Sequence, residues 1–141
     1  MRFLDANIFV YAFYRPNRRL SSREQRMKEE SKRILEAITD GKEKAITTMV
    51  HLSETVNMLK HGMDPPKLAD LVVQLLSLDN LRTETVDRDQ YLAAAELGRD
   101  LNRDPNDALA VLVMREHKLR EVYTYDGDFD ELEGIVKLPK T

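Results

Sequence analysis

Short apolar segments alternate along this chain with longer segments in which apolar residues recur every three or four positions. The short segments have the length of buried strands, and the longer ones have the period of an amphipathic helix. Strands that alternate with helices in this way indicate βαβ units and a parallel sheet. We therefore predict an α/β protein whose strands lie at residues 2–5, 44–47, 81–86, 122–125 and 135–138.

Local capping signals mark where the predicted helices begin. Residues 21–24 and 87–90 are capping-box sequences, and Asp-Pro pairs at 64–65 and 104–105 place an N-cap before a proline. The helices that follow these four signals are expected to end near residues 39, 102, 78 and 118, respectively. A further helix is predicted over residues 51–61, and a short one after the first strand. With 141 residues and no repeat or low-complexity linker, the chain is expected to be a single domain, residues 1–141.

Composition excludes several classes of site. The chain has no cysteine, which removes disulfides, thiolate zinc sites and cysteine nucleophiles. A metal ion would have to be held by oxygen atoms or by one of three histidines. No apolar segment approaches the roughly 20 residues that cross a bilayer, and the N-terminal segment lacks the cleavage site of a signal peptide. We expect a soluble cytoplasmic protein.

The net charge of −3 hides an uneven distribution of charged residues. Residues 15–33 carry eight Lys and Arg against three Glu, whereas residues 126–133 carry five acids and no base. A basic segment opposite an acidic cluster fits a metal-dependent site that acts on a polyanion. The alternative for the basic segment is a solvated helix face whose cations pair with nearby glutamates. The candidates for contact with the phosphates of such a polyanion are Arg15, Arg18, Arg19, Arg23 and Arg26.

Two aspartates that lie more than a hundred residues apart both follow predicted strands. Asp5 ends the first strand, and Asp126 directly follows the fourth. In open α/β sheets, ligands bind at the carboxyl ends of the strands, where the strand order reverses. If these strands are neighbours, the two carboxylates face each other, and a cation between them would relieve their repulsion.

Two further acids lie where a helix follows a strand or a cap. Glu54 lies in the first two turns of the helix after the second strand, and Asp107 is at the third position of the helix opened by Asp104 and Pro105. All βα junctions of a parallel sheet lie at one edge, so these carboxylates can converge with the first two. Such a cluster suits hard divalent cations, which can activate a water and stabilise the leaving oxygen of a phosphodiester. The alternative is that these are two ordinary helix acids among 25.

Four segments of the chain resemble the motifs of a known family. Residues 3–12, Phe-Leu-Asp-Ala-Asn-Ile-Phe-Val-Tyr-Ala, resemble the first motif of PIN domains, as in the VapC toxins of toxin–antitoxin pairs. The segments 52–57, 106–111 and 124–129 resemble the second, third and fourth motifs. The four segments occur in the family's order and span almost the whole chain.

The resemblance implies a three-layer α/β/α fold with a five-stranded parallel sheet in the order 3-2-1-4-5. It also implies a Mg²⁺- or Mn²⁺-dependent endoribonuclease whose usual substrates are single-stranded RNA or loops of tRNA and rRNA. The implied metal ligands are Asp5, Glu54, Asp107 and Asp126. We favour Asp126 over Asp128 because it is expected to end the strand directly; Asp128 is either a further ligand or a turn residue. Asn7 and Thr124 would orient the carboxylates through hydrogen bonds.

The resemblance further implies the toxin of a type II toxin–antitoxin pair, with a VapB-like antitoxin as partner and a homodimer as the expected assembly. Two alternatives are a PIN-like module that binds RNA or protein without cutting, and an RNA-processing nuclease outside such pairs. A phosphatase or receiver with Asp5 as phospho-acceptor is disfavoured, because haloacid-dehalogenase-type phosphatases have Asp-x-Asp where this chain has Asp-Ala-Asn. His51 is expected to be structural, and Tyr11, Phe13 and Tyr14 are expected to pack in the core or at a dimer contact more than to stack on bases.

Overall fold

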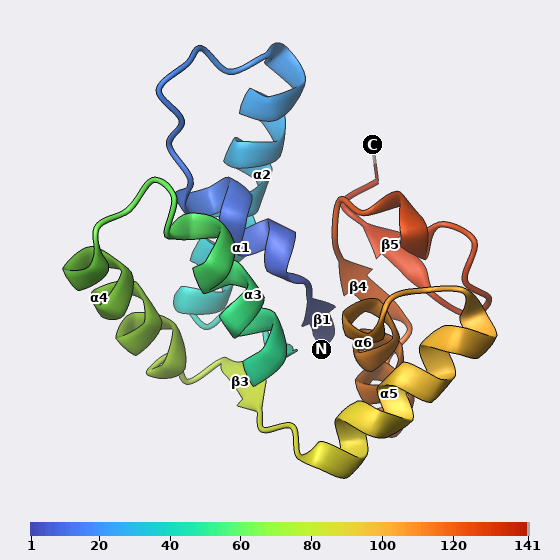
Figure 1. The fold of residues 1–141 in the computed structure, drawn as a ribbon. Coiled ribbons are helices and arrows are strands. Elements are labelled where there is room, and N and C mark those ends of the chain that lie inside the picture. The colour runs from blue at the N-terminus through green and yellow to red at the C-terminus, as the bar shows by residue number, and fades with distance from the viewer. Residues whose placement is uncertain (141) are drawn as a thin grey trace.

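Five parallel strands form the centre of the protein in the computed structural model, which describes residues 1–140 (Figure 1). The strands are β1 (Arg2–Leu4), β2 (Ala45–Thr48), β3 (Leu81–Glu84), β4 (Glu121–Tyr123) and β5 (Val136–Leu138). Their order in the sheet, β3-β2-β1-β4-β5, confirms the expected order. Because β1 and β4 are neighbours, the residues that follow them meet at one edge of the sheet.

The helices begin where the capping signals predict. Ser21 and Glu24 form a reciprocal capping box at the start of the second helix, and Asp87 and Gln90 form another at the start of the fifth. None of the helices formed by residues 1–140 combines the length and apolar character needed to cross a membrane. The helices are α1 (Ala6–Phe13), α2 (Ser22–Thr39), α3 (Met49–Leu59), α4 (Pro65–Leu76), α5 (Arg88–Leu101), α6 (Pro105–Glu116) and the 3-10 helix η1 (Gly127–Phe129).

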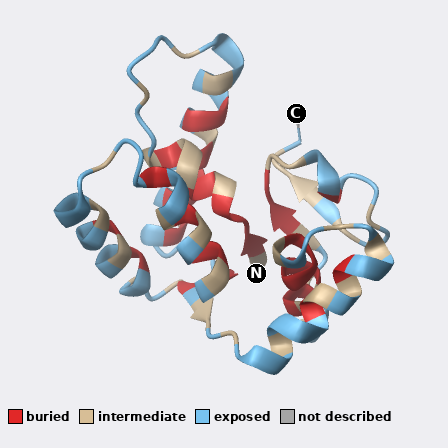
Figure 2. Cartoon of the chain, viewed as in Figure 1, coloured by how far each residue is buried: buried red, intermediate tan, exposed pale blue. Residues whose placement is uncertain are grey.

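The helices cover both faces of the sheet. Leu4 of β1 belongs to a core cluster with residues of α1, α2, α3 and α4, whereas its neighbour Phe3 belongs to a second cluster with α5 and α6. Adjacent residues of a strand point to opposite faces, so one short strand contributes to both cores. Buried residues accordingly concentrate in the strands and on the sheet-facing sides of the helices (Figure 2). The three-layer arrangement is confirmed.

Two strands end two residues earlier than predicted. β3 ends at Glu84 and β4 ends at Tyr123, two residues before the predicted ends. After Tyr123, two backbone N–H groups donate to side chains and not to a neighbouring strand. The Tyr125 N–H donates to Asn7 Oδ1, and the Asp126 N–H donates to Thr124 Oγ1. Asp126 therefore lies in a turn that caps η1, and the expectation that it directly ends the strand was wrong.

A glycine in α5 allows α6 to begin close beside it. A Cβ atom on Gly98 would lie 2.6 Å from the carbonyl oxygen of Arg103 and 3.4 Å from the Cβ of Ala108. The close approach places the N-terminus of α6, and with it Asp107, at the carboxyl edge of the sheet.

We predict that Gly98→Ala destabilises the protein, although this change inside a helix usually stabilises by about 1 kcal/mol. The carbonyl of Arg103 is backbone and cannot move without shifting the start of α6. We expect the free energy of unfolding, measured with urea, to fall by about 1–3 kcal/mol. Gly127→Ala is the control, because its nearest atom lies at 3.6 Å. Equal stabilities of the two variants would contradict the packing argument.

Candidate metal centre

Asp5 is the most firmly held of the candidate acids. It directly follows β1, caps the N-terminus of α1 and is 6% exposed. Its Oδ1 accepts a hydrogen bond from the Ala6 N–H at 2.8 Å, and its Oδ2 accepts one from Thr124 Oγ1 at 2.7 Å. Its own N–H donates to the Tyr123 carbonyl at 3.0 Å. These bonds fix the carboxylate between β1 and β4.

Asp107 and Asp126 join Asp5 in one group. A carboxylate oxygen from each of the three lies within 4.8 Å of the others. The N–H of Asp107 donates to Asp104 Oδ1, while Asp107 Oδ2 is buried without a hydrogen-bond partner in the described structure. Buried polar atoms are nearly always paired, so an unpartnered oxygen on a member of this carboxylate group fits a site that could hold a cation.

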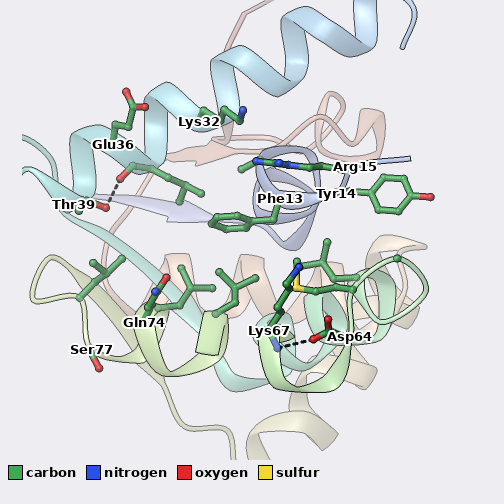
Figure 3. Close-up of a pocket in the computed structure, with 18 of the residues that line it drawn as sticks. Phe13, Tyr14, Arg15, Lys32, Glu36, Thr39, Asp64, Lys67, Gln74 and Ser77 are labelled. Carbon is green, nitrogen blue, oxygen red and sulfur yellow. Dashed lines mark hydrogen bonds between the residues drawn. The ribbon is translucent and has the colours of Figure 1, made fainter. Parts of the chain in front are cut away.

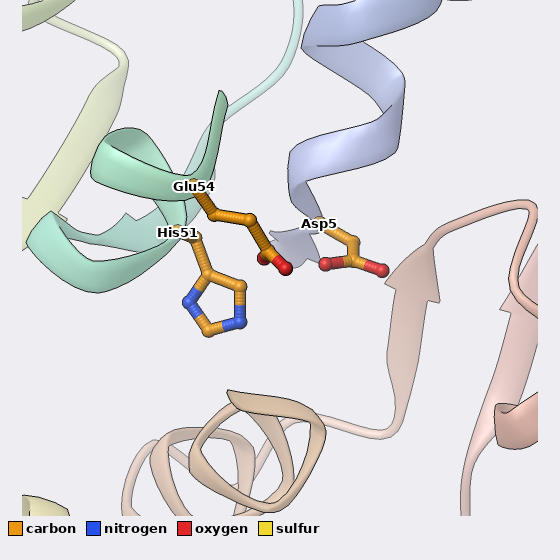
Figure 4. A group of neighbouring side chains, drawn as sticks. All are labelled: Asp5, His51 and Glu54. Atoms are coloured by element: carbon orange, nitrogen blue, oxygen red, sulfur yellow. The ribbon is translucent and has the colours of Figure 1, made fainter. Parts of the chain in front are cut away.

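Glu54 approaches the same aspartate from α3. Asp5, Glu54 and His51 form a second group whose ligand atoms lie within 4.8 Å of one another. Figure 4 shows the carboxylates of Asp5 and Glu54 turned toward each other, with the His51 ring on the side of Glu54. The structure thus brings all four predicted acids to one edge of the sheet, with Asp5 common to both groups.

His51 uses both ring nitrogens in structural hydrogen bonds. Its Nε2 lies 3.1 Å from the Asn106 carbonyl, which can only accept, so Nε2 carries the proton and donates. Its Nδ1 then accepts from the Thr48 hydroxyl at 2.7 Å. Burial lowers the pKa of this ring, which favours the neutral form. His51 therefore links α3 to the start of α6, in agreement with the structural role expected for it.

The crowding of acids changes their ionisation. Burial first, and then the negative charges of Asp104, Asp126 and Asp5, raise the pKa of Asp107 to about 8. Burial and the charge of Asp5 likewise raise the pKa of Glu54. Burial, followed by the charges of Asp128 and Asp5, raises the pKa of Asp126. A divalent cation among these groups would stabilise their charged forms, and an all-oxygen donor set fits Mg²⁺ or Mn²⁺.

Asn7 and Thr124 form a hydrogen-bond chain that ends on Asp5. Asn7 Nδ2 donates to Thr124 Oγ1 at 3.1 Å, and Thr124 donates in turn to Asp5 Oδ2. Asn7 Oδ1 also accepts from the Tyr125 N–H, which ties α1 to the segment after β4. Both residues are in position to orient the carboxylate, as predicted.

Asp128 belongs to neither carboxylate group. It is exposed, its N–H donates to Asp126 Oδ1 at 2.9 Å, and its carbonyl accepts from Arg103 Nε. It has the contacts of a turn residue that supports Asp126. The choice of Asp126 therefore agrees with the geometry, although the reason that we gave from the strand end does not hold.

Asn106 is a member of the site that its sequence position did not single out. Its carbonyl accepts from His51, and its Oδ1 accepts from the Tyr91 hydroxyl at 2.6 Å. One residue thus connects α3, α5 and α6 beside the carboxylates. The only available signal was its place directly before Asp107, because its two partners, His51 and Tyr91, are distant in sequence.

The five candidate arginines do not form one surface. Arg18 is paired with Glu24 through two hydrogen bonds of 2.6 and 2.9 Å. Arg15 lines a groove between α2 and α4, and Arg19 lies at a separate hollow at the start of α2. Only Arg23 and Arg26 line a pocket that also includes Thr124. The alternative interpretation, a solvated helix face whose cations pair with glutamates, therefore holds for the part of the basic segment that contains Arg18.

A parallel α/β protein with a carboxylate cluster where the strand order reverses belongs to the class that binds ligands at the carboxyl edge of the sheet. The family model described as PIN domain matches residues 2–135, so the chain belongs to the PIN domain family. A comparison with curated protein sequences gives no significant match.

Two solved structures resemble the whole chain. VapC20 of Mycobacterium tuberculosis, a sarcin-ricin loop cleaving toxin, has 23% identity and a TM-score of 0.68 over 92% of this chain and 93% of its own. A chain from a Klebsiella pneumoniae toxin–antitoxin complex has 18% identity and a TM-score of 0.63 over 96% of both chains. At these identities the likeness shows a shared fold.

We predict that Asp107→Asn stabilises the metal-free protein. The folded state keeps this proton up to a pH of about 8, whereas the unfolded chain releases it near its ordinary pKa of about 3.9. The free energy of unfolding therefore falls as the pH rises through that window, and the neutral amide removes this loss. In urea unfolding with EDTA at pH 8, we expect the variant to be more stable by about 1–3 kcal/mol.

The same pair of proteins provides the control. Near pH 4 the carboxyl group is largely protonated in the folded protein, so the difference between variant and wild type should become small. Added Mn²⁺ should stabilise the wild type more than the variant, because the variant has one ionised oxygen ligand fewer. A variant that is no more stable at pH 8 would contradict the view that burial and neighbouring charges destabilise the ionised form of Asp107.

Proposed function

We propose that this protein is a divalent-metal-dependent endoribonuclease that hydrolyses phosphodiester bonds of RNA. The observation that carries the proposal is the unpartnered, buried Oδ2 of Asp107, which lies in a group of carboxylates within a PIN domain. Burying a charged oxygen without a partner destabilises the folded state unless a cation binds to it. A cation at this acidic centre would also reduce its repulsion of a polyanionic substrate.

The proposed ligands are Asp5, Glu54, Asp107 and Asp126, and the proposed ion is Mg²⁺ or Mn²⁺. When bound, the ion activates a water and stabilises the charge that develops on the leaving oxygen. The hydrogen bonds from Ala6 and Thr124 hold Asp5 in place before the ion arrives. Glu54 and Asp107 must be ionised to act as ligands, so their raised pKa values make cation binding release protons.

We predict that Asp5→Asn abolishes RNA cleavage and leaves the fold intact. The amide keeps the size of the side chain and can still accept from Ala6, but it removes the charge common to both carboxylate groups. We expect the cleavage rate of labelled single-stranded RNA with Mn²⁺ to fall by at least about a hundredfold. Calorimetry should show weaker Mn²⁺ binding, while circular dichroism should be unchanged.

Two matched variants control for the loss of a negative charge. Asp70→Asn, on the exposed side of α4, should cleave as the wild type does. Asp128→Asn should retain most of the activity, because its carboxylate lies outside both groups. Cleavage by Asp5→Asn at the wild-type rate would remove the mechanism, and a wild type that neither cleaves RNA nor binds metal would favour a PIN-like binding module.

We also propose that the protein is the toxin of a type II toxin–antitoxin pair and acts in the cytoplasm. The likeness to a sarcin-ricin loop cleaving toxin and to a chain of a toxin–antitoxin complex supports this role. A homodimer is part of the proposal, and exposed Met49, Met58 and Tyr91 around one hollow between α3 and α5 support it. A nuclease that processes RNA outside such pairs would have the same centre.

A groove of about 910 Å³ between α2 and α4 supports a VapB-like antitoxin as partner (Figure 3). Leu35, Leu71 and Leu75 line its floor, and Lys32 and Lys67 lie on opposite sides of it. A groove lined by leucines and by charged residues of both signs suits an amphipathic helix with charged residues along its edges.

We predict that expression of the wild-type protein alone arrests growth of a bacterial host, whereas Asp5→Asn does not. Cleavage of an essential RNA would cause the arrest, so the catalytic variant is the matched control. Co-expression of a small protein encoded beside this gene should restore growth and co-purify with the chain. Undisturbed growth despite cleavage in vitro would favour an RNA-processing nuclease outside toxin–antitoxin pairs.

A further inference from the structure

A second, smaller pocket lies beside the carboxylates, on the side of α2. It has a volume of about 460 Å³ and is bordered by α2, by the segment after β4 and by the chain around β5. Four cationic side chains line it, Arg23 and Arg26 from α2 and Lys137 and Lys140 from the C-terminal segment. The two pairs are more than a hundred residues apart in sequence, so only the fold brings them together.

The cations of this pocket are largely free to bind an anion. The one acid of the lining, Glu30, pairs with Arg33, and Lys137 pairs with Asp130 at 2.9 Å. Within residues 1–140, Arg23, Arg26 and Lys140 are exposed and form no ion pair. This contrasts with Arg18, whose guanidinium is held by Glu24.

Tyr125 holds the pocket at a fixed position relative to the metal centre. Its hydroxyl donates to the Met27 carbonyl of α2 at 2.9 Å and accepts from the buried Ser31 hydroxyl at 2.9 Å. The preceding residue, Thr124, also lines the pocket and donates to Asp5. One short segment therefore lines the pocket with the cations and also hydrogen-bonds the carboxylate of Asp5.

We propose that this pocket binds the phosphodiester backbone of single-stranded RNA next to the bond that is cut, an inference that rests on the proposed nuclease function. Guanidinium groups match phosphate oxygens in a forked geometry, and cations beside an acidic centre offset its repulsion of a polyanion. The binding is to phosphates, so it carries no base preference. Of the five arginines predicted to contact RNA, only Arg23 and Arg26 line this pocket, and Lys137 and Lys140 line it as well.

The test is the double variant Arg23→Gln/Arg26→Gln, examined for binding of a short labelled single-stranded RNA by fluorescence anisotropy. EDTA keeps the centre inactive, so that binding is measured without cleavage. We expect Kd to rise about tenfold, and the slope of log Kd against log salt to fall by about 1.4, since single strands contribute about 0.7 for each phosphate contact. Both arginines are exposed, so unchanged thermal unfolding should show that the fold is intact.

The matched control is Lys44→Gln/Arg120→Gln, which changes the net charge equally. These exposed cations precede β2 and β4 and so lie at the opposite edge of the sheet. The control should bind RNA with the wild-type Kd and salt slope. Equal weakening of both double variants, an unchanged slope in the pocket variant, or no RNA binding by the wild type would overturn the inference.

A separate cleavage assay with Mn²⁺ distinguishes failure of the pocket from failure of the nuclease function. Wild-type cleavage together with unchanged KM and Kd in the pocket variant would reject the pocket and keep the nuclease. Absence of cleavage together with RNA binding that depends on Arg23 and Arg26 would reject the nuclease and keep the pocket.

Discussion

Mutual repulsion among carboxylates at one edge of the sheet is the constraint on which the rest of this structure depends. Asp5 is held by two hydrogen-bond donors, and Asp107 lies in the first turn of α6, where the helix dipole favours negative charge. These contacts keep the acids in place but leave one buried oxygen without a hydrogen-bond donor, since Asp107 Oδ2 has no partner in the described residues. The fold therefore maintains an arrangement that is unfavourable without a cation, which is typical of a site preserved for its chemistry.

The two faces of the sheet each supply part of this edge, and specific contacts fix the parts relative to one another. Asp5 and Glu54 come from elements on the face covered by α1 to α4, whereas Asp107 comes from α6 on the other face. His51 joins the two sides through its bond to the Asn106 carbonyl, and Gly98 lets α6 start beside α5. The distances between the carboxylates thus depend on how the helices on both faces of the sheet pack, and not only on the residues of the site.

Much of the fold and of the acid set could be predicted, because their signals are local. Apolar segments and capping boxes depend on neighbouring residues, and Asp5 and Asp107 are identified by their position after a strand or a cap. The features that the sequence did not predict depend on contacts between residues distant in sequence. They are the end of β4, the connecting role of Asn106 and the separation of the five candidate arginines onto different surfaces. Lys28 is a clear case, since it counted as a surface cation but is buried and donates to three carbonyls at the end of α1.

The overall charge of −3 opposes binding of a polyanion, so the local arrangement of charge must decide whether RNA can approach. At physiological ionic strength, exposed charges are screened beyond about 8 Å, so the acids of distant surfaces contribute little at the centre. The cations of α2 are tied to the centre through hydrogen bonds, because Tyr125 joins α2 to the segment whose Thr124 donates to Asp5. In our proposals, an acidic centre and a basic border have complementary electrostatic roles: the first would hold a divalent cation, and the second would allow a phosphate backbone to come near it.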